Sequence, residues 1–74
     1  MTTRFLVFTE ANFMTKEMLY PMLDFAYGWE LVEAGPHDLG DYVETWRCEV
    51  RDEDAFVRYL SAFPQVLHLE EEQT

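Results

Sequence analysis

Between Asp41 and Arg51, apolar side chains recur at alternate positions, as in a β-strand that buries one face. Glu44 is the one charged residue on that face. The side chains fall into two sets: Tyr42, Trp46, Cys48 and Val50 on one face, and Val43, Thr45, Arg47, Glu49 and Arg51 on the other. A strand of this kind is stable only when other strands pair with it and a further layer covers its apolar face. The remaining residues must supply both.

Three further segments have the composition of strands. Arg4–Glu10 is apolar on both faces, which is typical of a strand in the middle of a sheet. Trp29–Ala34 and Gln65–Leu69 are shorter. Alternate positions place Trp29 and Leu31 on one face of the first, opposite Glu30 and Val32, and Leu67 and Leu69 on one face of the second, opposite Val66 and His68. Gly35–Gly40 is rich in turn-forming residues, so we expect a loop between the second and third strands.

Two helices are predicted. In Asn12–Tyr27 the apolar residues recur at helical spacing, and Gly28 is a favourable residue to follow a helix. Pro21 removes one hydrogen bond and collides with the preceding turn, so we expect a kink or break near Lys16–Tyr20. One packing stripe of this helix would contain Met14, Met18 and Met22.

The second helix is predicted to begin at Asp52, whose carboxylate can accept a hydrogen bond from the first turn. Glu53 and Asp54 follow it, where the helix dipole favours negative charge. Pro64 would end the helix. Its buried stripe would contain Phe56, Leu60 and Phe63.

The predicted order is therefore strand, helix, strand, strand, helix, strand. It favours a ferredoxin-like βαββαβ sandwich, an α+β fold in which a four-stranded antiparallel sheet has both helices on one face. The first and third strands would lie at the centre of the sheet. Residues 1–69 would form this single domain. Residues 70–74 have no apolar side chain, and we expect them to form a disordered acidic tail.

The charge of the chain restricts its partners. Its 74 residues include 15 acidic and 5 basic side chains, which gives a net charge of −10 at pH 7. Binding to nucleic acid depends on Lys and Arg that neutralise phosphates, so we expect no direct contact with nucleic acid or with anionic membranes. A basic protein surface is the partner that such a charge attracts. The aromatic content of 16% separates the chain from disordered acidic tails.

Motifs that carry enzymatic chemistry are missing from the sequence. Ser61 is the only serine and has no flanking glycines, and the three glycines are too far apart to form a phosphate-binding loop. The single Cys48 excludes an internal disulfide, and the two distant histidines do not have zinc-ligand spacing. We expect no catalytic residue, no metal and no cofactor. With no apolar run near the ~18 residues of a membrane span and no signal peptide, we expect a cytoplasmic protein.

Acidic residues interspersed with tyrosines are the candidates for contact with a basic partner, because tyrosine is enriched in interfaces and carboxylates steer association. One group would lie on the outward stripe of the first predicted helix, and the other would run from the turn-rich loop into the second helix. The candidate partner-binding residues are Glu17, Tyr20, Asp24, Tyr27, Asp38, Asp41, Glu49, Asp52, Glu53 and Asp54.

These features favour a small protein-binding inhibitor that occupies the basic nucleic-acid-binding surface of a target protein or complex. In size and composition the chain is similar to the small phage proteins that block bacterial defence, among them DNA mimics and anti-CRISPR proteins. The inhibitor hypothesis does not require a particular oligomeric state.

Two alternatives remain open at this point. The chain could be a homodimeric ferredoxin-like regulatory or ligand-binding module, paired through the open sheet face. That face would carry apolar residues of the first strand, either Leu6 and Phe8 or Phe5 and Val7. The chain could also be a small enzyme in which Glu44 or His68 acts within an aromatic pocket.

Overall fold

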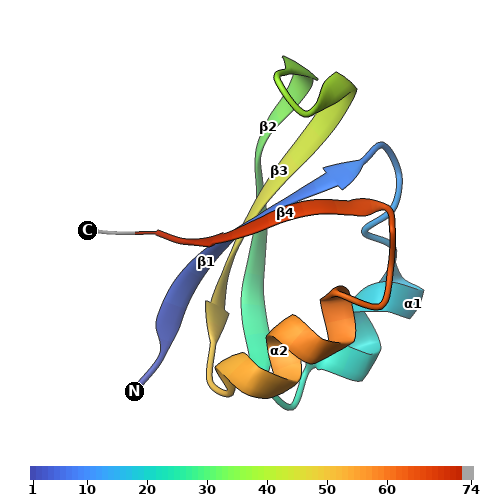
Figure 1. Ribbon diagram of the computed structural model, residues 1–74. Helices are drawn as coiled ribbons and strands as arrows, with labels where there is room; N and C mark the ends of the chain where they lie inside the picture. The colour runs from blue at the N-terminus through green and yellow to red at the C-terminus, as the bar shows by residue number, and fades with distance from the viewer. Residues whose placement is uncertain (73–74) are drawn as a thin grey trace.

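The computed structural model describes residues 1–72 and contains one four-stranded antiparallel sheet with two short helices (Figure 1). The order of strands across the sheet is β2-β3-β1-β4. Along the chain the elements are β1 (Thr3–Glu10), α1 (Lys16–Leu19), the 3-10 helix η1 (Tyr20–Met22), β2 (Ala26–His37), β3 (Gly40–Val50), α2 (Glu53–Leu60) and β4 (Val66–Glu71). The fold is therefore α+β.

The two strands with the strongest sequence signals lie at the centre of the sheet, as predicted. β1 pairs with β3 along its whole length, with Phe5 opposite Cys48 and Val7 opposite Trp46. On its other side β1 pairs with β4, where Val7 is opposite Leu69. Because directly opposed residues share a face, these pairs define the apolar side of the sheet.

The first helix is much shorter than the predicted Asn12–Tyr27. α1 contains four residues and is followed directly by η1, in which Pro21 occupies one of the first positions. Proline is accepted there because the first residues of a helix have no hydrogen-bond partner for their N–H groups. The predicted break near Lys16–Tyr20 is thus confirmed. The prediction that a helix resumes afterwards is wrong, because the chain turns and enters β2 at Ala26.

The hairpin formed by β2 and β3 is longer than the sequence indicated. β2 continues through Gly35 and Pro36 to His37, which pairs with Gly40, so the predicted loop is reduced to a two-residue turn. The pairing with β3 is irregular at three places, two of which contain a turn-forming residue, Gly28 or Pro36. Gly28 has a φ of 69° and lies at one of these irregularities within β2, not at the end of a helix.

α2 begins as predicted. The Asp52 carboxylate accepts a hydrogen bond from the Ala55 N–H at 3.1 Å, and Phe56 and Leu60 are fully buried. The helix ends at Leu60, before Pro64. Phe63 lies beyond it and packs edge-on against Phe13 and Tyr59.

One core fills the space between the sheet and the two helices, which cover the same face (Figure 1). It contains Phe5, Val7, Met14, Met22, Ala26, Cys48, Val50, Phe56 and Leu60. Met14 and Met22 are buried and Met18 packs against the same cluster, so the three methionines contribute to the core as expected. They do so from the segment before α1, from η1 and from α1, and not from the single predicted helix. In the described part of the chain, no helix has the length and apolarity to cross a membrane.

The acidic end of the chain takes part in the sheet. Glu70 and Glu71 extend β4 beyond the predicted Leu69, and the N–H of Glu72 donates to the carbonyl of Arg4 at 2.8 Å. The expected disordered tail was residues 70–74. Its first three residues are therefore paired with β1, and Gln73 and Thr74 lie outside the described residues.

Candidate protein-binding surfaces

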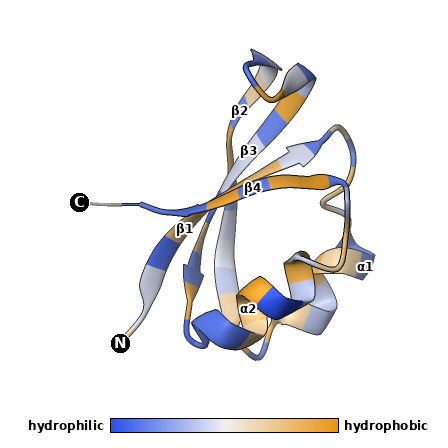
Figure 2. Ribbon diagram, viewed as in Figure 1, coloured by the Kyte–Doolittle hydropathy of each residue, from blue (hydrophilic) through white to orange (hydrophobic). Residues whose placement is uncertain are grey.

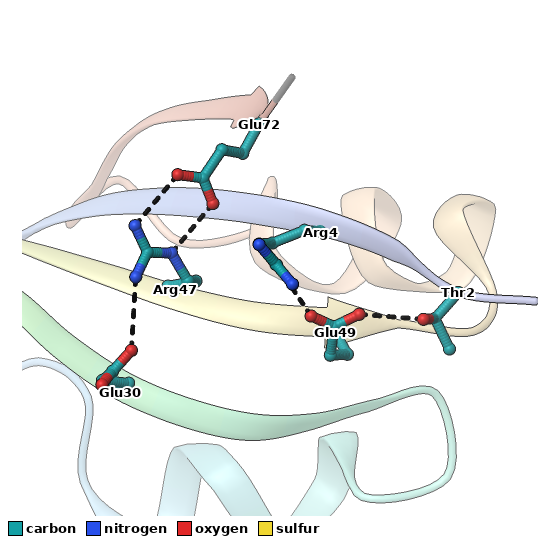
Figure 3. A network of polar contacts seen from close by, with 6 residues as sticks. All are labelled: Thr2, Arg4, Glu30, Arg47, Glu49 and Glu72. Atoms are coloured by element: carbon teal, nitrogen blue, oxygen red, sulfur yellow. Dashed lines mark hydrogen bonds and ion pairs between the residues drawn. The ribbon is translucent and has the colours of Figure 1, made fainter. Parts of the chain in front are cut away.

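The sheet face turned away from the helices carries a network of ion pairs (Figure 3), which we call the charged face. The Arg47 guanidinium donates two hydrogen bonds to the Glu72 carboxylate at 2.8 and 3.0 Å, and one to Glu30 at 3.4 Å. Arg4 donates to Glu49 at 2.9 Å, directly across the pairing of β1 with β3. Two of the five basic side chains are thus held by carboxylates of the protein itself.

The pKa values of this network are shifted in the directions that ion pairing requires. The hydrogen bond from Arg47 lowers the pKa of Glu72, and the hydrogen bond from Arg4 lowers the pKa of Glu49, with Thr2 as a second donor. The hydrogen bond to Glu72 in turn raises the pKa of Arg47. Both carboxylates therefore stay ionised at lower pH than an ordinary glutamate.

Around Phe8 the same face carries aromatic contacts and no ion pair of the network. The Phe8 ring lies 5.3 Å from the ring of His37 and 5.5 Å from that of His68, measured between centroids, and Phe8 is buried. His37 Nδ1 accepts a hydrogen bond from the Leu39 N–H at 3.1 Å, which holds the ring at the end of the hairpin. His68 Nε2 lies 3.2 Å from Glu70. His37 and His68 are both exposed and contact the same Phe8 ring.

A homodimer through this face would find little apolar surface. Phe8 is covered by the two histidines, and the adjoining Arg47 and Glu49 are engaged in ion pairs. Leu6, which shares this face, is itself half-buried.

A second surface lies where β3 leads into α2, and we call it the acidic end. Its exposed carboxylates are Asp24, Asp52, Glu53 and Asp54. Asp24 is brought there because the N–H of Arg51 donates to the carbonyl of Phe25 at 2.7 Å. Residues 51–54 line a shallow hollow of about 480 Å³. The four carboxylates thus come from two segments that are distant in the sequence.

Local contacts hold some of these carboxylates in place. Asp52 accepts from Ala55 at the start of α2, and Glu53 accepts from the Thr3 hydroxyl at 2.9 Å. The guanidinium of Arg51, the basic residue beside them, lies 4.6 Å from the centroid of the Tyr27 ring. The cation is therefore drawn over the aromatic ring at the border of the charged face.

The predicted stripe on the first helix does not form. Glu17 lies in α1, Tyr20 begins η1, Asp24 follows η1, and Tyr27 belongs to β2. All four side chains are exposed, Tyr20 to 65%. They do not share one helical face, because the helix ends at Leu19.

The other predicted acidic residues are also divided. Asp38 and Asp41 lie at the tip of the hairpin, whereas residues 52–54 lie at the opposite end of β3 (Figure 1). The 11 residues of β3 lie between the two groups and span at most about 33 Å at ~3.3 Å per residue. Glu49 lies near the end of β3 and is paired with Arg4. The structure brings together Asp52, Glu53 and Asp54 and adds Asp24 to them.

Glu44 and Cys48, the unusual polar residues on the apolar side of β3, have local contacts. The Glu44 carboxylate accepts from the N–H of Asn12 and from Trp46 Nε1, both at 3.4 Å. Asn12 has a φ of 62°, so Glu44 holds a left-handed turn between β1 and α1. Cys48 is 1% exposed, and burial raises the pKa of its thiol to about 12.

Sequence reasoning missed Glu30 and Glu72 as members of the charged face. The alternation of β3 already indicated that Arg47 points away from the core, but its partners depend on the register of strands β2 and β4 relative to β3. Glu72 was not predicted to pair with Arg47, because it lies in an acidic run without apolar residues that was expected to be disordered. A strand with one polar face can include such a run when its neighbour supplies an arginine.

The described residues contain no cluster of His, Cys, Asp and Glu that could hold a metal ion. Comparison of the sequence with protein-family models, with curated proteins and with solved structures found no match. The candidate surfaces are therefore interpreted from their own chemistry.

Proposed function

We propose that this protein inhibits a nucleic-acid-binding protein or complex by occupying its basic surface. The observation that carries the proposal is the acidic end, where the exposed residues Asp52, Glu53 and Asp54 line one hollow with Asp24 on the neighbouring segment, and the adjacent Arg51 is held over Tyr27. Such a surface attracts the Lys and Arg side chains that otherwise bind phosphates.

The ion pairs of the charged face support the same proposal. Arg4 and Arg47 are bound by Glu49 and Glu72, so these cations oppose the approach of a basic partner less than free ones would. Attraction between exposed charges falls off within about 8 Å at physiological ionic strength, so the acidic end acts only on a partner that comes into contact. Binding should therefore weaken steeply as salt is added.

The proposal extends to the kind of protein and to its fold. We infer an inhibitor of the phage anti-defence type, a DNA mimic or an anti-CRISPR protein, that works in the cytoplasm and has no catalytic activity. We also interpret the sheet as a ferredoxin-like sandwich in which the first helix is reduced to α1 and η1, because the order and pairing of the four strands match that architecture.

The proposal can be tested with two variants of equal charge. The first removes four charges from the acidic end with side chains of nearly the same shape: Asp24→Asn, Asp52→Asn, Glu53→Gln and Asp54→Asn. Asparagine is as good a helix cap as aspartate, so α2 should persist. The matched control removes four charges elsewhere: Glu10→Gln, Glu33→Gln, Asp38→Asn and Asp41→Asn. Asp38 and Asp41 were candidates from the sequence, but they lie at the hairpin tip, apart from the acidic end to which the proposal assigns binding. Each protein is immobilised and exposed to a nuclease-treated bacterial lysate.

The expected result is capture of one nucleic-acid-binding protein by the parent and by the control variant, with much less captured by the acidic-end variant. The captured protein should be released by raised salt and displaced by its own nucleic acid. Equal capture by both variants, or capture that competing nucleic acid does not affect, would contradict the proposal. Sedimentation of the parent alone tests the homodimer alternative, for which a dimer mass would be expected.

A further inference from the structure

The outer edge of β4 has backbone groups that no strand of the described chain pairs with. β4 is the last strand of the sheet and bonds only to β1. The Glu72 N–H points inward to Arg4, and backbone groups alternate in direction along a strand. Leu69 and Glu71 therefore direct their N–H and C=O groups outward. These groups are available to an additional strand.

A groove lies beside this edge and is lined by residues of β4 and of α2 with its C-terminal end. Both elements contain hydrophobic stretches, coloured orange in Figure 2. Its volume is about 410 Å³, and its lining residues are Val57, Ser61, Val66, Leu67, His68 and Leu69. Val57 is 40% exposed although it is apolar, and Leu67 and Leu69 are only half-buried. The side chains of a strand added to β4 would point alternately into this groove and away from it.

The opposite edge of the sheet is less suited to an added strand. β2 has three irregularities in its pairing and contains Pro36, so its backbone groups do not form a continuous row. β4 pairs regularly with β1 from His68 to Glu71, and its one irregularity lies before that stretch. The regular edge is also the one that adjoins the groove.

Charge determines what kind of strand fits. Beside the outward groups of β4, Glu70 lies on the charged face and Glu71 on the apolar side of the sheet. Asp54 precedes Val57 by three residues, so it lies on the same side of α2 as the groove. A second copy of the chain would bring another set of these carboxylates, and another charge of −10, to the same edge.

We propose that the edge of β4 binds an extended basic segment of the partner as a fifth strand. Alternate apolar side chains of that segment enter the groove against Val57 and Leu69, and the intervening Lys or Arg side chains lie beside Glu70. The inference depends on the proposed function only for the sign of the partner's charge. Main-chain hydrogen bonds to Leu69 and Glu71 supply affinity, and the groove favours segments in which every second side chain is apolar.

The probe is the peptide acetyl-(Lys-Val)₃-amide, and the control peptide Lys-Lys-Lys-Val-Val-Val has the same composition without alternation. Amide hydrogen exchange of the ¹⁵N-labelled protein is measured by NMR with each peptide in excess. We expect the alternating peptide to slow exchange at Leu69 and Glu71 by about tenfold when most sites are occupied. The control peptide should leave exchange at these two amides unchanged.

Two protein variants localise the contact. Val57→Asn makes the groove polar, and Val32→Asn makes the same change on β2 at a residue of similar exposure, 44% against 40%. Val57→Asn should weaken peptide binding about fivefold, since part of a valine contact is lost, and Val32→Asn should leave it unchanged. Protection by both peptides, or perturbation confined to residues 52–54, would overturn the inference. Protection of Leu69 that rises with protein concentration alone would also overturn it, because a second copy would then fill the edge.

The two proposals fail in different ways. If Val57→Asn captures the basic target as well as the parent does, the fifth-strand inference falls and the acidic end remains. If the alternating peptide protects β4 but neutralising the acidic end does not reduce capture, the inhibitor proposal falls and the strand-binding edge remains.

Discussion

Burial of Cys48 makes the stability of this protein depend on pH in the alkaline range. The thiol is 1% exposed, and desolvation, assisted by the charge of Glu49, raises its pKa from the ordinary 9.0 to about 12. The fold thus favours the neutral thiol. Its contribution to stability is complete below pH 9 and is lost as the pH rises from 9 towards 12. At pH 10 most unfolded thiols are ionised and almost no folded ones are, which lowers the free energy of unfolding by about 1.4 kcal/mol.

The measurement compares the parent with Cys48→Ala, which has no thiol to ionise. Urea unfolding of both proteins at pH 7 and pH 10, with a reductant present, gives four free energies of unfolding. The cavity left by the substitution contributes equally at both pH values, and all other titrating groups are shared. The stability advantage of the parent over Cys48→Ala should therefore shrink by about 1.4 kcal/mol at pH 10. An advantage that is the same at both pH values would refute the reasoning that the thiol is held neutral by burial.

Three further predictions concern other contacts. Phe56→Ala should lower the free energy of unfolding by about 3–5 kcal/mol in urea titrations, because Phe56 is fully buried and the centroid of its ring lies 5.1 Å from that of Phe5. The same change at the exposed neighbouring residue, Val57→Ala, should lower it by under about 1 kcal/mol. Asp52→Ala should cost about 1 kcal/mol by removing the cap on Ala55, and Asp52→Asn should cost far less. Arg47→Gln should raise the pKa of Glu72 towards 4.5 in a carboxyl NMR titration. Because the pKa of Glu72 is lowered in the folded protein, the ion pair stabilises the fold above pH 4.5, and this stabilisation is lost as the pH falls. A pKa of Glu72 that is the same in Arg47→Gln and in the parent would contradict the ion pair.

Much of the fold could be predicted because the strands follow simple alternation. The two-faced apolar pattern of Arg4–Glu10 and the one-faced pattern of Asp41–Arg51 correctly identified the central strands. Asp52 was correctly predicted as a cap because its position before an apolar helical stripe permits few other roles.

The bounds of the first helix could not be predicted, because the local apolar spacing favours a helix whereas pairing with distant residues favours a strand. The apolar spacing of Asn12–Tyr27 is helical, but Pro21 begins a 3-10 helix and Ala26 gains more from pairing beside Val50 in the sheet. Likewise Gly35 and Pro36 favour a turn by themselves, yet they remain in β2, where Gly35 pairs with Val43, His37 pairs with Gly40 and the His37 ring packs on Phe8. Such pairings involve residues far apart in the sequence, which periodicity does not describe.

The candidate surfaces were less predictable than the fold for the same reason. The charge and its sign were evident from composition, but which carboxylates gather depends on how segments meet. Asp24 joins Asp52 only through the bond from Arg51 to Phe25, and Glu72 meets Arg47 only across two strands.

The position of β1 at the centre of the sheet has a consequence for how the protein is made. β1 is synthesised before the other strands of the sheet, but its partners are β3 and β4, the last two of them. Until residue 71 has emerged, the edge of β1 that pairs with β4 has no partner strand, and the apolar side chains of β1 are not fully buried. A sheet built from such distant pairings folds in about milliseconds to seconds, whereas synthesis of 74 residues at roughly 5–20 residues per second takes about 4–15 s. Folding should therefore be completed in one cooperative step once β4 is free, and exposure of the nascent β1 should be set by the rate of translation.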